Sequence, residues 1–317
     1  MVAMRVLILG AGGIGGYFGA RIHASGGDVT FLVRPGRAAV LRESGLKVFS
    51  SLGDLCIAPK LLTKDELNRL DARFDAVILS CKAYDLDSAM DDIAPAVGPE
   101  TLLLPLLNGV SHMDRLAARY GGQRVLGGVA QAALLVTPDG EIRHFNSTHR
   151  LIIGARGEGM REPPGLRALA ALIADSGVEF MLSDDIEQAM WNKFVFWASL
   201  AGATCTLRAN IGIILQTTGG AEFVTGLVAE CARIAELAGH ALSESQLATC
   251  RNLLTESGSV LAASMLRDIE RGGPTEAEYT LGDLMERCRA SEINAHCLRL
   301  AYSHMQAYEI RRQTSCT

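Results

Sequence analysis

The spacing of hydrophobic residues changes once along the chain, near residue 183. Before that point, apolar residues gather in short runs such as residues 6–9 and 76–79, and each run ends in glycine or polar residues. Runs of this kind are typical of buried strands in a parallel sheet. After that point, apolar residues recur at helical intervals and no further strand is predicted. We therefore predict an α/β, Rossmann-like domain over residues 1–183 and an all-α domain over residues 184–317.

Smaller elements complete this outline. In the first domain, alternation of apolar and polar residues predicts a hairpin over residues 45–62. Three further strands are expected over residues 124–154, as an antiparallel or mixed extension of the sheet. Ser183 or Asp184 is expected to cap the first long helix of the second domain, with Glu187 in its first turn. Further helices are predicted over residues 221–238, 243–256, 260–271, 274–289 and 295–311.

The first apolar run leads directly into the motif GAGGIGG. Gly10 allows the chain to turn sharply out of the strand, Gly12 leaves room for a pyrophosphate at the backbone, and Gly15 lets the helix pack closely on the strand. Gly13 and Ile14 belong to the first helical turn, whose N–H groups have no partner inside the helix and can bind phosphate. The order of strand, glycine turn and helix predicts a dinucleotide-binding site. A glycine-rich structural turn is the alternative.

Two arginines follow the second predicted strand, where the adenine ribose of a dinucleotide would lie. These are Arg34 and Arg37. Enzymes that use NAD have an acidic residue in this region, whereas an arginine accommodates the 2′-phosphate of NADP. No acidic residue occupies this turn, so the sequence favours NADP(H) over NAD(H). The alternative is that both arginines are simply solvated on an exposed loop.

Polar residues also follow two later strands of the predicted sheet. Lys82 comes shortly after the run over residues 76–79, and Asn108 ends the run that begins at Leu102. Ligands bind at the carboxyl ends of strands in open α/β sheets, so both residues are candidates for contact with a cofactor or a substrate. An ordinary surface lysine and a turn asparagine before Gly109 are the structural alternatives.

The helical domain contributes three polar candidates. Lys193 lies in an apolar helix, where partial desolvation would lower its pKa toward neutrality and suit it to act as a general acid. A lysine whose stem packs on apolar neighbours is the alternative. Ser264 and Glu276 flank a Gly-Gly-Pro break, but charge alone does not favour Glu276 over Glu270 or Glu278.

Composition narrows the class of protein. The 317 residues carry a formal net charge of -5 and no basic patch interleaved with aromatic residues, which argues against nucleic-acid binding. No apolar run reaches the roughly 18 residues that a membrane span needs, and the start of the chain lacks the pattern of a signal peptide. The eight cysteines show no metal-binding spacing and suit reduced thiols. We expect a cytoplasmic protein without a bound metal.

Taken together, these segments resemble the ketopantoate reductase (2-dehydropantoate 2-reductase) family over nearly the whole chain. The resemblance is carried by GAGGIGG, SCKAYD, LLNGV, MWNKF and ASMLRDIERGGPTE, in this order. It implies that the glycines of the first motif and Arg34 hold NADPH. It also implies that Lys82 and Asn108 reach the cofactor or the substrate at the strand ends.

The same resemblance implies roles for the helical domain. Lys193 would be the general acid that protonates the ketone oxygen of a 2-oxo acid while hydride is delivered to the adjacent carbon. Glu276 would complete the catalytic pair, and both Glu276 and Ser264 would hydrogen-bond the substrate. The product would be a 2-hydroxy acid, which in the family is pantoate on the pathway to coenzyme A.

Trp197 and Ala201 depart from the family pattern. Members active on ketopantoate tend to carry asparagines at these places, one and two helical turns after the lysine. An indole and a methyl group in place of two amides make a less polar pocket, with Trp197 in contact with the substrate. The substrate is therefore expected to be 2-dehydropantoate or another 2-oxo acid or ketone with a less polar tail. A non-catalytic NADP-binding sensor is the alternative of a different class, and a homodimer is a candidate assembly.

Overall fold

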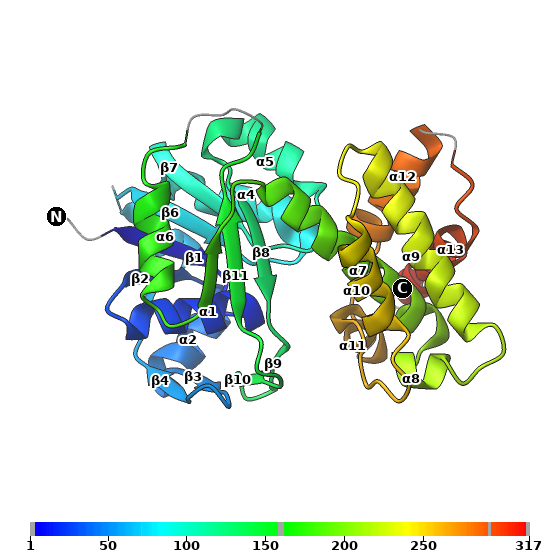
Figure 1. Cartoon of the computed structure of the whole chain (residues 1–317). Helices are drawn as coiled ribbons and strands as arrows, with labels where there is room; N and C mark the ends of the chain where they lie inside the picture. Colours follow the sequence, from blue (N-terminus) through cyan, green and yellow to red (C-terminus); the bar gives the residue numbers. More distant parts are fainter. Residues whose placement is uncertain (1–3, 71, 158–161, 291–292, 315–317) are drawn as a thin grey trace. The chain divides into compact units, whose positions relative to one another are not determined.

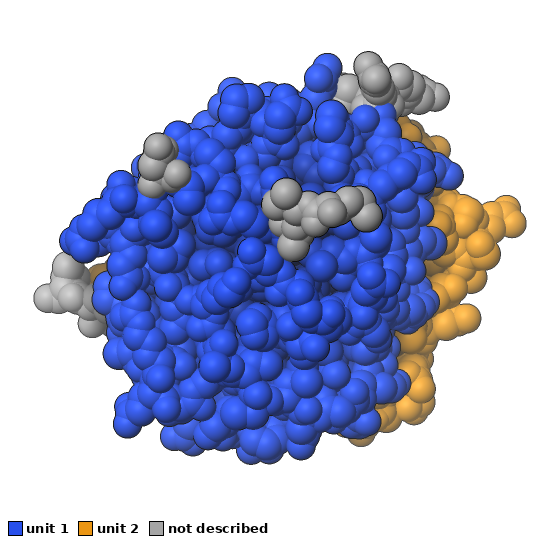
Figure 2. Space-filling view, turned by 90° about the vertical axis from the view of Figure 1, so that its left-hand side faces the viewer, with its two compact units in different colours: residues 1–107, 112–189 blue, residues 108–111, 190–317 orange. Residues whose placement is uncertain are grey.

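The computed structural model describes residues 4–70, 72–157, 162–290 and 293–314. The chain forms two compact units, which Figure 2 colours separately. The first comprises Met1–Leu107 and His112–Ala189, and the second comprises Asn108–Ser111 and Met190–Thr317. Among the described residues, every strand lies in the first unit, and the second is helical (Figure 1). This division falls after Ala189, whereas the sequence predicts a domain boundary after residue 183, which stays a prediction.

The centre of the first unit is a five-stranded parallel sheet in the order β5-β2-β1-β6-β7. Its strands are β1 Arg5–Leu9, β2 Asp28–Leu32, β5 Lys60–Leu62, β6 Phe74–Leu79 and β7 Val97–Pro105. Because β1 lies between β2 and β6, the strand ends that lead to Gly10, Arg34 and Lys82 share one edge of the sheet. Pro105 ends β7, as expected of a residue without an N–H. The predicted Rossmann-like fold is confirmed.

Two smaller sheets complete the strands of this unit. β3 Leu46–Phe49, β4 Leu55–Ile57, β9 Leu134–Val136 and β10 Ile142–His144 form one, in the order β4-β3-β10-β9. β8 Gly127–Gln131, β11 Arg150–Gly154 and β12 Glu179–Leu182 form the other, in the order β12-β11-β8. β3 and β4 pair antiparallel, so the predicted hairpin is present, but it ends at Ile57 and residues 60–62 belong to the parallel sheet as β5. The N–H of Leu126 donates to the carbonyl of Leu103 in β7 (2.8 Å), so the second small sheet continues the parallel one.

The apolar run over residues 124–136 is two strands, β8 and β9, so residues 124–154 contain four strands and not the three that the sequence predicts. The chain changes sheet at Ala132 and Ala133. Ala133 donates its N–H to the side chain of Asn146 (3.2 Å) and accepts from the N–H of Phe145 (2.9 Å). Its backbone thus pairs with the segment after β10 and leaves the ladder of β8. Pairing partners distant in sequence, more than local propensity, decide where this strand ends.

Helix α1, Gly13–Ala24, packs on β1 through the glycine motif. Gly10 has φ +92°, a left-handed conformation that glycine adopts without strain. A Cβ on Gly15 would come 2.6 Å from the carbonyl oxygen of Gly10 and would also clash with Ser80 Oγ. The helix can therefore approach the strand this closely only without a side chain at Gly15. The other helices of the unit are α2 Pro35–Ser44, α3 Lys64–Arg69, α4 Leu86–Ile93, α5 His112–Tyr120 and α6 Leu166–Ala174.

The second unit is built around α7, Ile186–Leu207, whose 22 residues begin just before the division. The remaining helices are α8 Ile211–Ile214, α9 Gly220–Leu237, α10 Glu244–Leu254, α11 Ser264–Glu270, α12 Asp283–Ala290 and α13 His296–Thr314, with a π-helical turn over Glu278–Gly282. In the part of the chain that the structure describes, no helix is long and apolar enough to cross a membrane.

Asp185 caps α7, which corrects the expectation that Ser183 or Asp184 does so. The carboxylate of Asp185 accepts a hydrogen bond from the N–H of Gln188 (3.0 Å). The hydroxyl of Ser183 instead accepts from the N–H of Asp185 (3.2 Å), one step ahead of the helix. Two acceptors in succession therefore order the entry into α7.

Two further helices begin four residues later than predicted, at Ser264 and at Glu278. The carbonyls of Ser259 and Leu261 accept hydrogen bonds from the N–H groups of α8, so this stretch of backbone is already engaged. Likewise, the N–H and the hydroxyl of Thr275 both donate to a carboxylate of α13. In both places a partner distant in sequence holds the chain out of the helix that the local pattern favours.

We expect Gly15→Ala to destabilise the first unit by about 1–3 kcal/mol, because the new methyl group overpacks the contact between α1 and β1. The measurement is a lower midpoint of urea unfolding. Gly122→Ala is the matched control, since its Cβ would lie 3.9 Å from Ala117, an ordinary contact. Equal midpoints for the two variants would show that a methyl group at residue 15 is accommodated without strain.

Candidate functional site

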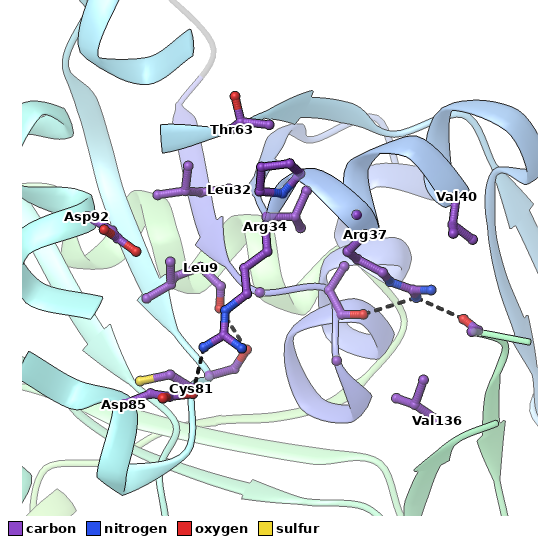
Figure 3. A pocket seen from close by; sticks show the side chains of 18 of the residues that line it. Leu9, Leu32, Arg34, Arg37, Val40, Thr63, Cys81, Asp85, Asp92 and Val136 are labelled. Carbon is purple, nitrogen blue, oxygen red and sulfur yellow. Dashed lines mark hydrogen bonds and ion pairs between the residues drawn. The ribbon is translucent and has the colours of Figure 1, made fainter. Parts of the chain in front are cut away.

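A cavity of about 870 Å³ lies beside the glycine motif in the first unit (Figure 3). The turn after β1, the start of α2, the residues after β6, part of α4 and the turn between β9 and β10 form its walls. Its lining includes Gly10, Gly12, Arg34, Cys81 and Asp85. A cavity of this size at the carboxyl ends of parallel strands suits a ligand of nucleotide size.

The N-terminus of α1 is free to receive an anion at this cavity. Gly12 is the N-cap, no side chain caps the helix there, and its first turn contains no acidic residue. A Cβ on Gly12 would meet nothing within 4 Å, so its backbone faces open space. The positive end of the helix and its first N–H groups therefore fit a pyrophosphate. Gly10 and Gly12 line the cavity, whereas Gly13, Ile14 and Gly15 form the first turn of α1.

Arg34 extends into the cavity from the carboxyl end of β2, and its side chain is 82% exposed. Its Nη2 lies 3.0 Å from Oδ2 of Asp85 on the wall that follows β6. Figure 3 marks this contact with a dashed line. A phosphate could take the place of this carboxylate, because both anions accept hydrogen bonds from a guanidinium. The sequence predicted Arg34 as a ligand for the 2′-phosphate. It gave no signal for Asp85, whose pairing depends on the sheet order.

Arg37 lies in the first turn of α2, just after Arg34, but its side chain makes different contacts. Its Nη2 donates to the carbonyl oxygens of Ala11 (3.2 Å) and Gly140 (2.8 Å), and Figure 3 shows both bonds. Burial lowers the pKa of its guanidinium. Arg37 thus ties the glycine turn to the loop between β9 and β10. Of the two arginines, Arg34 is the one with a largely exposed side chain, and its contact with a ligand stays a prediction.

In the second unit, a lysine and a glutamate form an electrostatic pair. Lys193 lies on α7 and is half-buried, and Glu276 lies just before the π-helical turn with 3% of its surface exposed. Burial lowers the pKa of Lys193 to about 8, and the negative charge of Glu276 opposes that shift. The lysine can therefore exchange a proton near neutral pH, which is the property required of a general acid or base.

The loop Asn108–Ser111 belongs to the same unit. The hydroxyl of Ser111 donates to the carbonyl of Tyr279 in the π-helical turn (3.0 Å). A side chain on Gly109 would come within 3.3 Å of that carbonyl oxygen and 3.6 Å of Phe194, the next residue after the candidate lysine. The loop, the segment with the candidate glutamate and α7 are thus packed together. The sequence had placed this asparagine only at the end of a strand.

One face of α7 connects Lys193 to Ser264. Trp197, Ala201 and Thr204 follow the lysine at intervals of 4, 8 and 11 residues, which places them on one side of the helix. Trp197 is 8% exposed and Ala201 is fully buried. The hydroxyl of Thr204 accepts the N–H of the residue before Ser264 (3.3 Å). An indole and a methyl group therefore occupy the stretch between the two predicted substrate contacts.

Two predictions remain: the contact of Lys82 with a ligand and the absence of a bound metal. Lys82 follows Cys81 at the end of β6, beside the cavity wall, and its contact with a ligand stays a prediction. Among the residues described, no group of three or more His, Cys, Asp or Glu side chains is arranged to hold a metal ion.

The chain matches two family models that together span most of its length. The model described as ketopantoate reductase PanE/ApbA matches residues 6–158, and the model of the C-terminal part of the same family matches residues 185–309. The chain is also 33% identical to the uncharacterized oxidoreductase YkpB of Bacillus subtilis, over 98% of this chain and 100% of that protein.

Two solved structures share this fold. The 2-dehydropantoate 2-reductase of Methylococcus capsulatus is 26% identical, with a TM-score of 0.84 over 98% of each chain. A D-mandelate dehydrogenase with NADH and anilino(oxo)acetate is 22% identical, with a TM-score of 0.87 over 98% of this chain and 99% of that one. The second likeness concerns the fold alone.

We expect Arg34→Ala to weaken NADPH binding by roughly 10- to 100-fold, because a hydrogen bond to a charged group is worth about 1.5–3 kcal/mol. NADH, which lacks the 2′-phosphate, should bind within a fewfold of its original affinity. The measurement is titration of cofactor fluorescence with both dinucleotides. Asp85→Asn should have the opposite effect and raise the affinity for NADPH by up to about fivefold, because it removes the ion pair that competes for Arg34 and exposed ion pairs are worth about 0–1 kcal/mol.

Equal losses of NADPH and NADH in Arg34→Ala would contradict the phosphate assignment. Asp28→Asn is the control for the aspartate variant, because Asp28 also pairs with an exposed cation, Lys60 (2.7 Å), but does not line the cavity.

Proposed function

Because the chain belongs to the ketopantoate reductase PanE/ApbA family, we propose that it reduces a 2-oxo acid to the 2-hydroxy acid, with 2-dehydropantoate as the first candidate substrate. As a member of this family it is an oxidoreductase that uses NADP(H). The observation that carries the proposal is the pairing of Lys193 with Glu276 in the second unit.

Bound NADPH supplies the hydride for the carbonyl carbon, so this chain must supply a proton for the carbonyl oxygen. Lys193 is assigned that proton. With a pKa of about 8 its ammonium is mostly charged at neutral pH, yet it gives up a proton far more readily than a lysine in water. Reduction should therefore slow as the pH rises through about 8, where the lysine loses the proton that it has to donate.

The distribution of lysine and arginine along the chain supports this role. Lysine and arginine together number 30, but only five of these are lysines, and Lys193 is the one lysine after Lys82. A guanidinium stays protonated throughout the physiological range and cannot act as a proton donor there, whereas an ammonium can. A lysine in a part of the chain where the other strongly basic residues are arginines is consistent with a position that must release a proton.

The other assigned contacts follow from their positions. The first turn of α1 would hold the pyrophosphate, and Arg34 the 2′-phosphate. Asn108 and Ser264 would hydrogen-bond the oxo acid at the two ends of the α7 face, and Glu276 would orient both the substrate and the ammonium of Lys193.

A second candidate substrate class is favoured by Trp197 and Ala201. Both are buried on the face of α7 between Lys193 and Ser264 and offer no amide to a hydroxylated substrate. The indole of Trp197 offers one N–H donor and the methyl group of Ala201 offers none, so this face pairs with a substrate hydroxyl less well than two amides would and accepts apolar tails more readily. An oxo acid with an apolar or aromatic tail is therefore the alternative to 2-dehydropantoate.

The test of the proposed function follows NADPH absorbance with 2-dehydropantoate, phenylglyoxylate, 2-oxoisovalerate and pyruvate side by side. We expect Lys193→Met and Lys193→Arg to lower kcat on the preferred acid by roughly two to four orders of magnitude, the usual contribution of general acid catalysis. NADPH affinity should be unchanged in both variants, because the residues assigned to the pyrophosphate and to the 2′-phosphate lie in the first unit.

Lys60→Met is the control, since it removes an exposed lysine of the first unit. Turnover of Lys193→Arg at the original rate would show that charge alone, without proton transfer, is what the position supplies. Tight NADPH binding without oxidation by any acid would support the sensor instead.

For the substrate class, we expect Trp197→Asn with Ala201→Asn to raise kcat/KM on 2-dehydropantoate at least tenfold relative to phenylglyoxylate, because the new amides can pair with the hydroxyl of the former. The ratio of the two kcat/KM values is the quantity measured. An unchanged or lower ratio would show that polarity on this face of α7 does not select the substrate.

A further inference from the structure

The segment that carries Glu276 has no regular structure of its own. The sequence predicts a helix from Pro274, but helical structure begins only at Glu278. A segment of this kind keeps one conformation only when contacts from elsewhere hold it. The carbonyl of Glu276 accepts hydrogen bonds from the N–H of Tyr279 (3.1 Å) and the hydroxyl of Thr280 (2.7 Å), which link it to the turn that follows. The chain before Glu276 depends on contacts from elsewhere in the fold.

Helix α13 supplies those contacts. The hydroxyl of Tyr308 donates to the carbonyl of Gly273 (2.7 Å), and the hydroxyl of Tyr302 donates to the carboxylate of Glu278 (2.5 Å). Between them, Oε1 of Glu309 accepts two hydrogen bonds from Thr275, one from its N–H and one from its hydroxyl, each at 2.7 Å. One helix thus holds the chain before and after the candidate glutamate.

The contact at Glu309 is the one nearest to Glu276 along the chain. Thr275 is 6% exposed, so water could not easily replace Glu309 as the partner of its N–H if that carboxylate were removed. The other oxygen of the Glu309 carboxylate accepts from Nε of Arg312 (2.9 Å), which fixes the plane of the carboxylate. Pro274 restricts the backbone just before Thr275. These constraints leave the residue after Thr275 little freedom of direction.

We propose that Glu309 is a positioning residue for the reaction: by binding both the N–H and the hydroxyl of Thr275, it fixes the backbone from which Glu276 acts on Lys193. This inference rests on the proposed function, because it takes Glu276 and Lys193 as the reacting pair. Glu309 itself touches neither the substrate nor the cofactor in this account. It acts through Thr275 alone.

The test compares Glu309→Ala, Glu276→Gln and the double variant by steady-state kinetics with NADPH and the preferred 2-oxo acid. We expect Glu309→Ala to lower kcat/KM by roughly 10- to 100-fold, as a small displacement of a catalytic group can. The double variant should be no slower than Glu276→Gln, because the anchor has no effect once the carboxylate it positions is gone. A purely structural role would make the two losses multiply.

Glu236→Ala is the matched control. Glu236 pairs with Arg233 on α9 at the same i,i+3 spacing as Glu309 with Arg312, and its kcat/KM should stay within about twofold of the original. Hydrogen exchange followed by mass spectrometry gives a readout besides activity. Glu309→Ala should speed exchange in residues 273–282, and Glu236→Ala should not.

Glu309→Gln keeps a carbonyl oxygen for Thr275 and should recover most of the activity that Glu309→Ala loses. If Glu309→Ala does not fold, Thr275→Val serves in its place, since it removes only the hydroxyl donor. Multiplying losses, or unchanged exchange in residues 273–282, would overturn the positioning role. Normal turnover of Lys193→Met would instead refute Lys193 as the proton donor of the proposed function. In that case, a double variant no slower than Glu276→Gln would still support Glu309 as the residue that positions Glu276.

Discussion

A partly buried lysine ammonium near one carboxylate is the interaction on which the candidate site of the second unit depends. Burial makes the charge on Lys193 unfavourable, and Glu276 compensates only in part, so the pKa settles near 8. Such a balance is sensitive to small displacements of either group, because the attraction between two charges changes steeply with distance in a poorly solvated site. The contacts of α13 and of the Asn108–Ser111 loop around the π-helical turn can be understood as the means of keeping that distance constant.

The first unit solves a different problem by different means. It leaves groups exposed at the cavity: an uncapped helix N-terminus, open space at Gly12 and an arginine whose side chain is 82% exposed. Rigidity here comes from the close contact of α1 with β1 and from Arg37, which ties two loops together through backbone carbonyls. The backbone is therefore held rigidly around the glycine motif, while the cavity beside it, where a ligand is expected, stays open.

The sequence was most informative where function needs a fixed local pattern. Gly10, Gly12 and Gly15 predict the turn and the packing of α1 because each glycine meets a steric demand visible within one motif. It was least informative where distant segments meet. Nothing near Asp85 indicates that it faces Arg34, and nothing near Thr275 indicates that a carboxylate 34 residues later will take its N–H. For the same reason helix starts were misplaced at α11 and at Pro274, where remote hydrogen bonds override a good local helical pattern.

The assignment of Asn108–Ser111 to the helical unit has a consequence for how this protein can be divided. The chain passes between the units three times, after Leu107, after Ser111 and after Ala189. A gene fragment that encodes only residues 190–317 therefore lacks a piece of the unit it is meant to produce, including the hydroxyl that binds the carbonyl of Tyr279. The two halves of this fold are not separable modules that recombination could exchange at a single junction, since any exchanged helical half needs a matching loop from the other.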